Sequence, residues 1–252
     1  MTHTAIPTGL VHPAIPRPDA MRLAATAYQR FAAAIAELSD EDWERPTDCA
    51  EWDVRAMVAH VGGMADFAAS PLEMRRQLRL AKASGREPSI DALTQLQVEE
   101  HVHLSPTDLV AAARRSGDRA ARGRRRTPGL IRRRRLPEPQ VVNGRTEFWS
   151  IGFLTDVILT RDTWLHRIDV CRATSREPVL TAEHDGRIVA DVVAEWAARH
   201  GRPYRLTLTG PAGGTWASGD DGDLVVMDAV DFCRTLSGRA HGTGLLSTEV
   251  PF

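Results

Sequence analysis

Residues 52–64 read WDVRAMVAHVGGM and residues 160–173 read TRDTWLHRIDVCRA, and each segment carries one histidine among apolar neighbours. Asp162 and His166 are four positions apart, so on a helix both side chains project from one face and can bind a single ion. His60 from the first segment would complete a set of two imidazoles and one carboxylate. This set is typical of a divalent metal site with positions open for chemistry. A buried histidine satisfied by a backbone carbonyl is commoner, so the spacing alone leaves both interpretations open.

Three segments of the chain carry a family resemblance. They are LSDEDWERPTDCAEWDVRAMVAHVGGM (38–64), TRDTWLHRIDVCRATSREP (160–178) and DAVDFCRTLSGRAHGTGLLSTEVPF (228–252). Through these segments the chain resembles the actinobacterial mycothiol-dependent maleylpyruvate isomerase family, from about residue 20 to Phe252. The resemblance implies an α+β fold, with an N-terminal DinB-like four-helix bundle and a small sterol-carrier-like α/β C-terminal domain.

The sequence predicts three parts: a flexible arm over 1–18, a metal-binding helical bundle over 19–176 and an α/β domain over 180–252. Prolines at positions 7, 13, 16 and 18 indicate the arm, and alternation in YRLTLTG (204–210) indicates a strand. Apolar spacing and capping residues predict the helices. The first helix is capped by Asp19, and the second is capped by Asp53 and weakened at Gly62-Gly63. The third is assembled from Ile90 to Val102 and from Pro106 to about Arg122, and the fourth runs from Phe148 or Phe153 to Ala173. Two more follow, one over 182–200 and a last one ended by Gly238.

Composition is typical of a globular enzyme. The 252 residues are 42% hydrophobic and carry a formal net charge of −1, which excludes a general attraction to nucleic acid or to membranes. Neither a signal peptide nor a membrane span is expected, so we expect a cytoplasmic protein. Three cysteines without a CxxC pair argue against a disulfide framework or a cysteine zinc cluster. The oligomeric state is not indicated.

A basic segment runs from Arg122 to Arg135. Such a run can bind nucleic acid or attract an anionic substrate. The favoured interpretation is a solvated helix end followed by an exposed loop, because no aromatic residues alternate with the arginines. His101 and His103 point to different faces of a helix and are interpreted as surface or loop residues.

Two further residues are candidates for supporting roles. Asp169, three residues after His166, either orients that imidazole or is an ordinary surface carboxylate. Arg239 follows Gly238 and is a candidate for binding a substrate carboxylate, because a guanidinium holds a carboxylate through two hydrogen bonds. Arg234 is its rival for this role, and Arg239 has the alternative of capping helix-end carbonyls.

The chemistry depends on what an open divalent site does to a thiol. Zinc is the first choice of metal, and Ni²⁺ or Fe²⁺ also suits His60, Asp162 and His166. Family members often carry glutamate at the position of Asp162, which leaves open whether this shorter carboxylate binds directly or through water. The resemblance implies mycothiol as the thiol, held as a thiolate that attacks a small electrophilic substrate.

Two outcomes of that attack remain open. Addition to a conjugated enoate, rotation and elimination give the trans isomer and return the thiol, whereas a stable adduct amounts to S-transfer. Nucleophilic catalysis by Cys49 is disfavoured, since no histidine is its neighbour in the sequence. The alternative class is a non-catalytic module that binds a metal or thiol, or serves in regulation.

Overall fold

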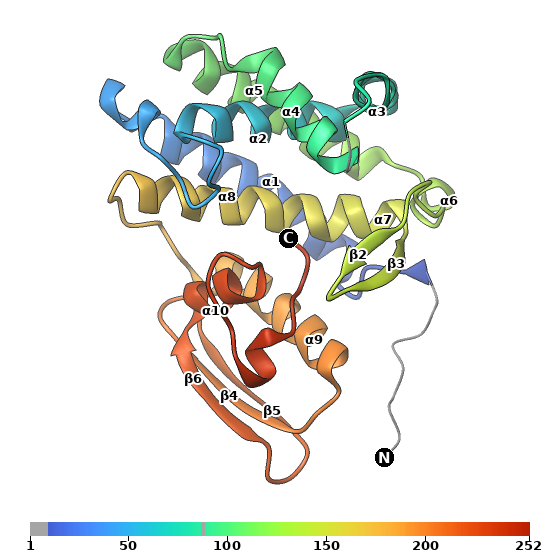
Figure 1. Cartoon of the computed structure of the whole chain (residues 1–252), viewed down its shortest axis with the longest axis vertical. Coiled ribbons are helices and arrows are strands. Elements are labelled where there is room, and N and C mark those ends of the chain that lie inside the picture. Colours follow the sequence, from blue (N-terminus) through green and yellow to red (C-terminus); the bar gives the residue numbers. More distant parts are fainter. Residues whose placement is uncertain (1–9, 87–88) are drawn as a thin grey trace. The chain divides into compact units, whose positions relative to one another are not determined.

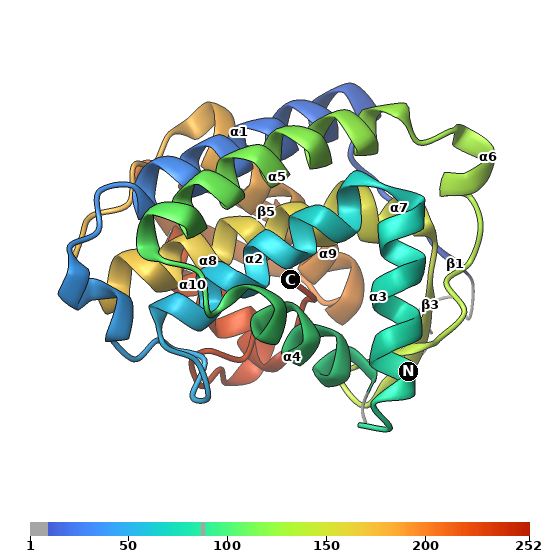
Figure 2. The same cartoon turned by 90° about the horizontal axis from the view of Figure 1, so that it is seen from above.

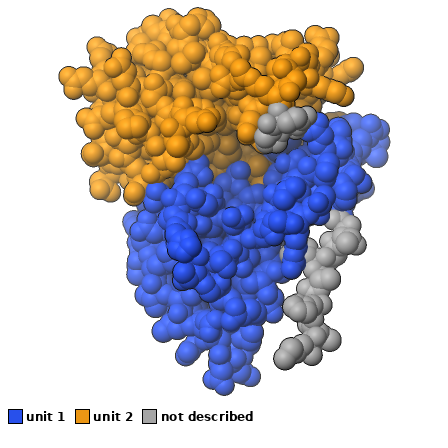
Figure 3. Space-filling view, viewed as in Figure 1, with its two compact units in different colours: residues 1–16, 130–154, 179–252 blue, residues 17–129, 155–178 orange. Residues whose placement is uncertain are grey.

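The structure, a computed structural model, describes residues 10–86 and 89–252, and the chain divides into two compact units (Figures 1 and 3). The helical unit comprises Arg17–Gly129 and Thr155–Pro178. The mixed unit comprises Leu130–Leu154, Val179–Phe252 and the described residues up to Pro16. The fold is therefore α+β with a helical N-terminal region, as the sequence analysis predicted.

The described part of the helical unit is a four-helix bundle with two additional α-helices. The bundle helices pack in the pairs α1–α5, α5–α2, α2–α8 and α8–α1, and Figure 2 shows α1 running beside α5. Helices α3 and α4 pack against α2 and against each other. The elements are α1 (Arg17–Ile35), a short 3₁₀ helix (Asp40–Glu44), α2 (Val54–Ala69), α3 (Pro71–Ala83), α4 (Ser89–His101), α5 (Pro106–Arg126) and α8 (Leu159–Ala173).

Capping residues explain where several helices begin. The Asp53 carboxylate accepts a hydrogen bond from the Ala56 amide at 2.7 Å, so the predicted N-cap of α2 is confirmed. Helix α1 begins at Arg17, and the prediction that Asp19 caps it is wrong, because Pro18 already occupies the first turn where no amide hydrogen is needed.

Helix α3 was missed by the sequence analysis. Helix α2 continues through its glycine pair to Ala69, so α3 starts immediately afterwards, with Ser70 as its cap and Pro71 as its first residue.

The core of the helical unit is apolar and lies between α1, α2, α5 and the end of α8. Burial of these side chains, each worth about 1.5–3 kcal/mol for a large aliphatic or aromatic residue, fixes α2 beside α8 and so positions the residues on their facing sides. The buried cluster consists of Phe31, Ile35, Trp43, Val54, Met57, Val58, Ala59, Val61, Leu109, Ala113 and Val170.

Over the residues that the structure describes, the mixed unit contains two three-stranded sheets. In the first, β3 lies between β1, to which it is parallel, and β2, to which it is antiparallel. Asn143 and Gly144 both have positive φ, 52° and 69°, as a tight two-residue hairpin turn requires. In the second, β4 lies between antiparallel β5 and parallel β6. The strands are β1 (Leu10–Val11), β2 (Gln140–Val142), β3 (Arg145–Trp149), β4 (Tyr204–Thr209), β5 (Gly214–Ser218) and β6 (Asp223–Asp228).

The helices that follow residue 180 match the predicted C-terminal pattern. Gly238, with φ of 80°, follows the last helix as expected. The helical elements of the mixed unit are α6 (Gly129–Arg132), α7 (Ile151–Phe153), a π-helical turn (Ala182–Gly186), α9 (Arg187–His200), α10 (Ala229–Leu236) and a 3₁₀ turn (Gly244–Ser247).

The boundaries of the two units differ from the expected ranges. Residues 130–154 group with the mixed unit, although the sequence analysis included them in the bundle range 19–176. Within the expected arm, Leu10–Val11 pairs with β3, and residues 1–9 lie outside the described residues. A π-helical turn (Leu154–Ile158) joins α7 to α8, and the boundary between the two residue ranges falls within this turn, after Leu154.

The basic segment is mostly exposed, with one exception. Arg124 is buried in the bundle, where its guanidinium donates hydrogen bonds to Thr160 Oγ1 at 2.6 Å and Tyr28 Oη at 3.4 Å. The interpretation of this segment as a solvated helix end and loop is therefore wrong for Arg124, which bridges α5, α8 and α1. None of the described helices has the length and apolar character that crossing a membrane requires.

Candidate metal centre

The structure brings His60, Asp162 and His166 together. His60 lies in the middle of α2, and the other two lie one turn apart on α8. One ligand atom from each residue lies within 4.8 Å of the other two. Nε2 of His60 is 3.5 Å from Oδ1 of Asp162, and Nε2 of His166 is 3.3 Å from the same oxygen. Two imidazole nitrogens thus converge on one carboxylate oxygen.

The site is enclosed by protein. His60 and His166 are 2% and 6% exposed, and the side chain of Asp162 is 14% exposed. The imidazole rings meet edge to face with centroids 5.2 Å apart. Trp52, just before α2, places its ring centroid 4.8 Å from that of His60 and 6.1 Å from that of His166. The aromatic ring therefore shields both imidazoles from water.

Each imidazole has a second partner on its other nitrogen. Nδ1 of His60 is 2.9 Å from Oε1 of Gln97, and Nδ1 of His166 is 3.1 Å from Oδ2 of Asp169. Asp169 is fully buried, so of its two predicted roles the structure favours the one that orients His166. With both Nδ1 atoms engaged, both Nε2 atoms are directed to the shared space at Asp162.

His166 and Asp162 form a buried ion pair in the metal-free protein. Burial opposes the charged form of His166, but the charge and hydrogen bond of Asp162 and the hydrogen bond of Asp169 outweigh it and raise the pKa of His166 to about 9. Burial also opposes ionisation of Asp162, yet the positive charge and hydrogen bond of His166 hold the pKa of Asp162 below its usual range. The carboxylate is therefore ionised at neutral pH.

The donor set fits a divalent metal ion. Among the described residues, nothing donates a hydrogen bond to Oδ2 of Asp162, although this oxygen is buried. A buried carboxylate oxygen without a partner is costly, and a cation bound there would compensate it. Two imidazole nitrogens and a carboxylate that lie within 4.8 Å of one another can reach one ion, given metal–nitrogen bonds of about 2 Å.

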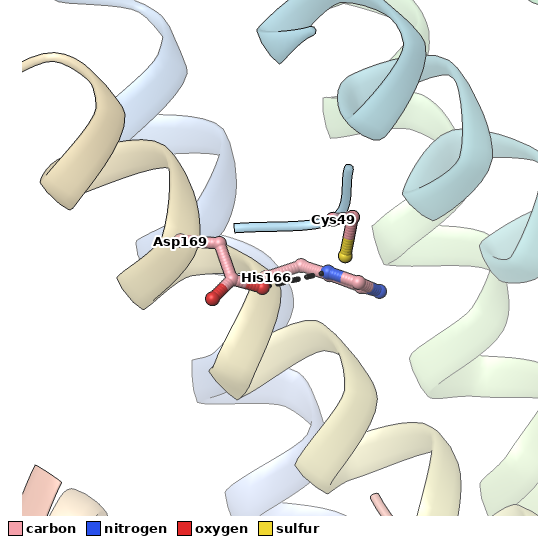
Figure 4. A group of neighbouring side chains, drawn as sticks. All are labelled: Cys49, His166 and Asp169. Carbon is pink, nitrogen blue, oxygen red and sulfur yellow. Dashed lines mark hydrogen bonds and ion pairs between the residues drawn. The ribbon is translucent and has the colours of Figure 1, made fainter. Parts of the chain in front are cut away.

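A cysteine that the sequence analysis set aside lies next to this centre. Within the described residues, Cys49 forms a second group with His166 and Asp169, whose ligand atoms also lie within 4.8 Å of one another. Figure 4 shows the Cys49 sulfur beside the His166 ring, on a loop that precedes α2. Cys49 and His166 are distant in the chain, so only the packing of this loop against α8 could reveal their proximity.

Arg239 belongs to the mixed unit, whereas the metal ligands belong to the helical unit. It is half-buried and lines a pocket of about 270 Å³, together with Val142, Trp149, Val250 and Phe252. Its rival Arg234 is 7% exposed and lies within helix α10.

Comparison with known proteins identifies the class of this helical domain. The family model described as the mycothiol maleylpyruvate isomerase N-terminal domain matches residues 24–171, more than half of the chain. The chain therefore belongs to this family, as the resemblance predicted.

Solved structures show the same fold. Two crystal structures of the mycothiol-dependent maleylpyruvate isomerase, one of them a histidine-to-alanine mutant, share 19% and 17% sequence identity with this chain. Each aligns with a TM-score of 0.55 and covers 94% of this chain and 95% of its own. No curated protein sequence matches the chain significantly.

Proposed function

We propose that this protein is a metal-dependent enzyme that uses a low-molecular-weight thiol to isomerise or S-conjugate a small electrophilic substrate. Mycothiol is the first candidate for the thiol, and the family membership supports it. The observation that carries the proposal is the convergence of two imidazole Nε2 atoms on Oδ1 of Asp162, whose other oxygen is buried without a hydrogen-bond partner among the described residues.

The residues of this chain would perform three tasks. His60, Asp162 and His166 would hold the ion and leave further coordination positions open. A divalent ion there, zinc first and Ni²⁺ or Fe²⁺ as alternatives, would lower the pKa of a bound thiol so that it is a thiolate at neutral pH. Asp169 and Gln97 orient the two imidazoles. Trp52 covers them and restricts access of water, which strengthens electrostatic interactions at the site.

Turnover tests this proposal directly. The protein is stripped with a chelator, reloaded with zinc and assayed with mycothiol and conjugated enoates, of which maleylpyruvate is the first choice. We expect turnover only when metal and thiol are both present. Unchanged thiol concentration would indicate isomerisation, and loss of thiol would indicate S-transfer. Turnover by the stripped protein, or without thiol, would contradict the proposal.

One observation favours a second candidate, a non-catalytic metal-binding module. The Cys49 sulfur lies within 4.8 Å of a ring nitrogen of His166. Movement of its loop to supply a thiolate as a fourth ligand would close the site, and closed sites with four protein ligands are typically structural.

Substitution of Cys49 separates the two candidates. We expect Cys49→Ser to bind metal with an affinity within about threefold of the native protein and to retain turnover, because the three proposed ligands are unchanged and the thiol comes from solution. Cys233→Ser, which alters a buried cysteine of the mixed unit, serves as the matched control. Loss of most metal binding in Cys49→Ser alone would support the closed site instead.

Arg239 is proposed to bind a carboxylate of the substrate. We expect Arg239→Lys to raise KM by the equivalent of roughly 1–3 kcal/mol, because lysine cannot form the two parallel hydrogen bonds of a guanidinium. Metal content and melting temperature should stay unchanged. Arg202→Lys, at an exposed ion pair with Asp223, is the control. Native kinetics in Arg239→Lys would assign Arg239 to a structural role at the end of α10.

A further inference from the structure

A chain of buried side-chain amides extends from His60 to the surface of the helical unit. Nδ1 of His60 is 2.9 Å from Oε1 of Gln97, and Nε2 of Gln97 donates to Oε1 of Gln77 at 2.9 Å. Nε2 of Gln77 in turn donates to the carbonyl oxygen of Gly63 at 3.1 Å and to Oε1 of Glu73 at 3.0 Å. Gln77 and Gln97 are both fully buried, where an unpaired amide would be costly. The chain therefore connects α2, α3 and α4 through polar groups that depend on one another.

The far end of the chain determines the direction of every hydrogen bond in it. A backbone carbonyl and a carboxylate only accept, so the amide nitrogen of Gln77 must face Gly63 and Glu73. Its oxygen then faces Gln97, which must present its own nitrogen to Gln77 and its oxygen to His60. An amide oxygen accepts only, so Nδ1 of His60 must carry a hydrogen. In the neutral imidazole, Nε2 is then the nitrogen with the free lone pair.

Glu73, the carboxylate at the far end of this hydrogen-bond chain, is itself held in place. Arg76 donates from Nε to Oε2 of Glu73 at 2.9 Å, and from its two terminal nitrogens to both carboxylate oxygens of Glu100 at 2.6 and 2.7 Å. This ion pair network joins α3 to α4 and fixes the carboxylate that orients Gln77. Arg76 and Gln77 donate hydrogen bonds to the carboxylate of Glu73. These bonds outweigh the effect of burial and keep the pKa of Glu73 below its usual value, so this carboxylate is ionised.

Gly63 of helix α2 leaves the space that the side chain of Gln97 occupies. A Cβ atom added at Gly63 would lie 2.6 Å from Cβ and 2.8 Å from Cγ of Gln97, closer than such atoms approach. A Cβ atom added at the adjacent Gly62 would meet nothing within 4 Å. The close approach of Gln97 to His60 therefore depends on Gly63 and not on Gly62.

We propose that Gln97 is a positioning residue that holds His60 in the tautomer with hydrogen on Nδ1, so that Nε2 presents its lone pair to the ion. Gln77 fixes the orientation of the Gln97 amide, and Gly63 allows its approach. The inference deepens the proposed function, because it rests on His60 as a metal ligand. Without Gln97, the hydrogen is free to move to Nε2 and form a hydrogen bond with Asp162, 3.5 Å away. A nitrogen that carries this hydrogen has no lone pair to offer the metal.

The neutral amide also suits the charge of the site. Asp162 and Asp169 already place two carboxylates beside the two imidazoles. The amide of Gln97 orients the ring of His60 without adding a third carboxylate to the site.

The tautomer is measured on the metal-free protein with ¹⁵N-labelled histidine, by NMR correlation of the ring nitrogens with the ring carbon-bound hydrogens. The His60 signals are assigned by their loss in His60→Ala. We expect hydrogen on Nδ1 in the native protein, and a shift of hydrogen to Nε2 in Gln97→Met, which keeps the size of the side chain but not the acceptor. Hydrogen on Nε2 in the native protein would overturn the proposal.

Zinc affinity, measured by competition with a chelator, gives the second readout. We expect Gln97→Met to weaken zinc binding about 10–100-fold, the usual loss when the outer partner of a ligating histidine is removed. Unchanged affinity and tautomer in Gln97→Met would overturn the proposal. A native protein that has hydrogen on Nδ1 but binds no zinc would instead contradict the proposed function and leave the tautomer assignment intact.

The two glycines provide a matched pair of variants. Gly63→Ala should displace Gln97 and weaken zinc binding about 10–100-fold as well, through the same loss of the outer partner. Gly62→Ala should bind zinc like the native protein and be as stable or more so, because alanine favours a helix over glycine by about 1 kcal/mol. Equal zinc affinity in these two variants would contradict the role assigned to Gly63.

Discussion

His166→Ala is expected to lose more than about 100-fold in affinity for zinc, the upper end of the loss seen when only an outer partner is removed. The reason is that His166 supplies one of three protein ligands and, through its contact with Asp162, also orients a second one. His60→Ala should show a loss of the same size. The measurement is metal content after dialysis against a series of chelators of known affinity, with melting temperature measured in parallel.

His103→Ala is the control for these variants. His103 is exposed and lies after α4 in the same unit, so its removal tests for a general effect of losing a histidine. We expect native zinc affinity in this variant. Full metal occupancy in both His60→Ala and His166→Ala would show that these residues are not the ligands.

Metal affinity is also expected to depend steeply on pH. The pKa of His166 in the metal-free protein is raised to about 9, so near pH 7 a proton occupies the nitrogen that the ion needs. Binding must release that proton, and the affinity should therefore rise about tenfold per pH unit, or about 100-fold between pH 6 and 8. Isothermal titration in two buffers of different ionisation enthalpy measures both the affinity and the protons released.

The same shift predicts how stability changes with pH. The folded chain holds the His166 proton more tightly than the unfolded chain, whose ordinary pKa is 6.5. This contribution to the free energy of unfolding is fully present below pH 6.5 and disappears as the pH rises towards about 9 in the metal-free protein.

Asp169→Asn is the informative variant for both effects. Asp169 helps to raise the pKa of His166. Its loss should therefore lower the pH above which zinc affinity and the free energy of unfolding stop changing with pH. A zinc affinity that is independent of pH between about 6 and 8 in the native protein would contradict the assignment of His166 as a protonated ligand.

The proposed ligand set could be predicted from the sequence because it rests on local periodicity. Asp162 and His166 are one turn apart on any helix, and His60 stands in an apolar stripe that had to face the same core. Gln97 and Gln77 could not be found in this way. They lie on helices whose arrangement around α2 cannot be predicted from the sequence. Gly63, which leaves space for Gln97, is recognised in the sequence only as a residue that weakens the helix.

The parts of the fold that were missed have different physical causes. The Asn143-Gly144 pair is a strong hairpin signal between β2 and β3, but strands this short lack the alternation by which strands are normally predicted. Helix α3 was missed because it buries only Gln77 and Ala81, so its sequence lacks the apolar stripe by which a helix is predicted. Arg124 is buried in a run of exposed arginines, and only its partners Thr160 and Tyr28 distinguish it from its neighbours.

The most direct test of the central claim is the absorption spectrum of the Co²⁺-loaded protein as mycothiol is added. An open centre formed by His60, Asp162 and His166 predicts that no thiolate-to-cobalt band is present at the start. It further predicts that such a band grows in the near ultraviolet with the thiol, equally in the native protein and in Cys49→Ser. No band at saturating thiol would contradict the account, as would a band present before the thiol is added and lost in Cys49→Ser.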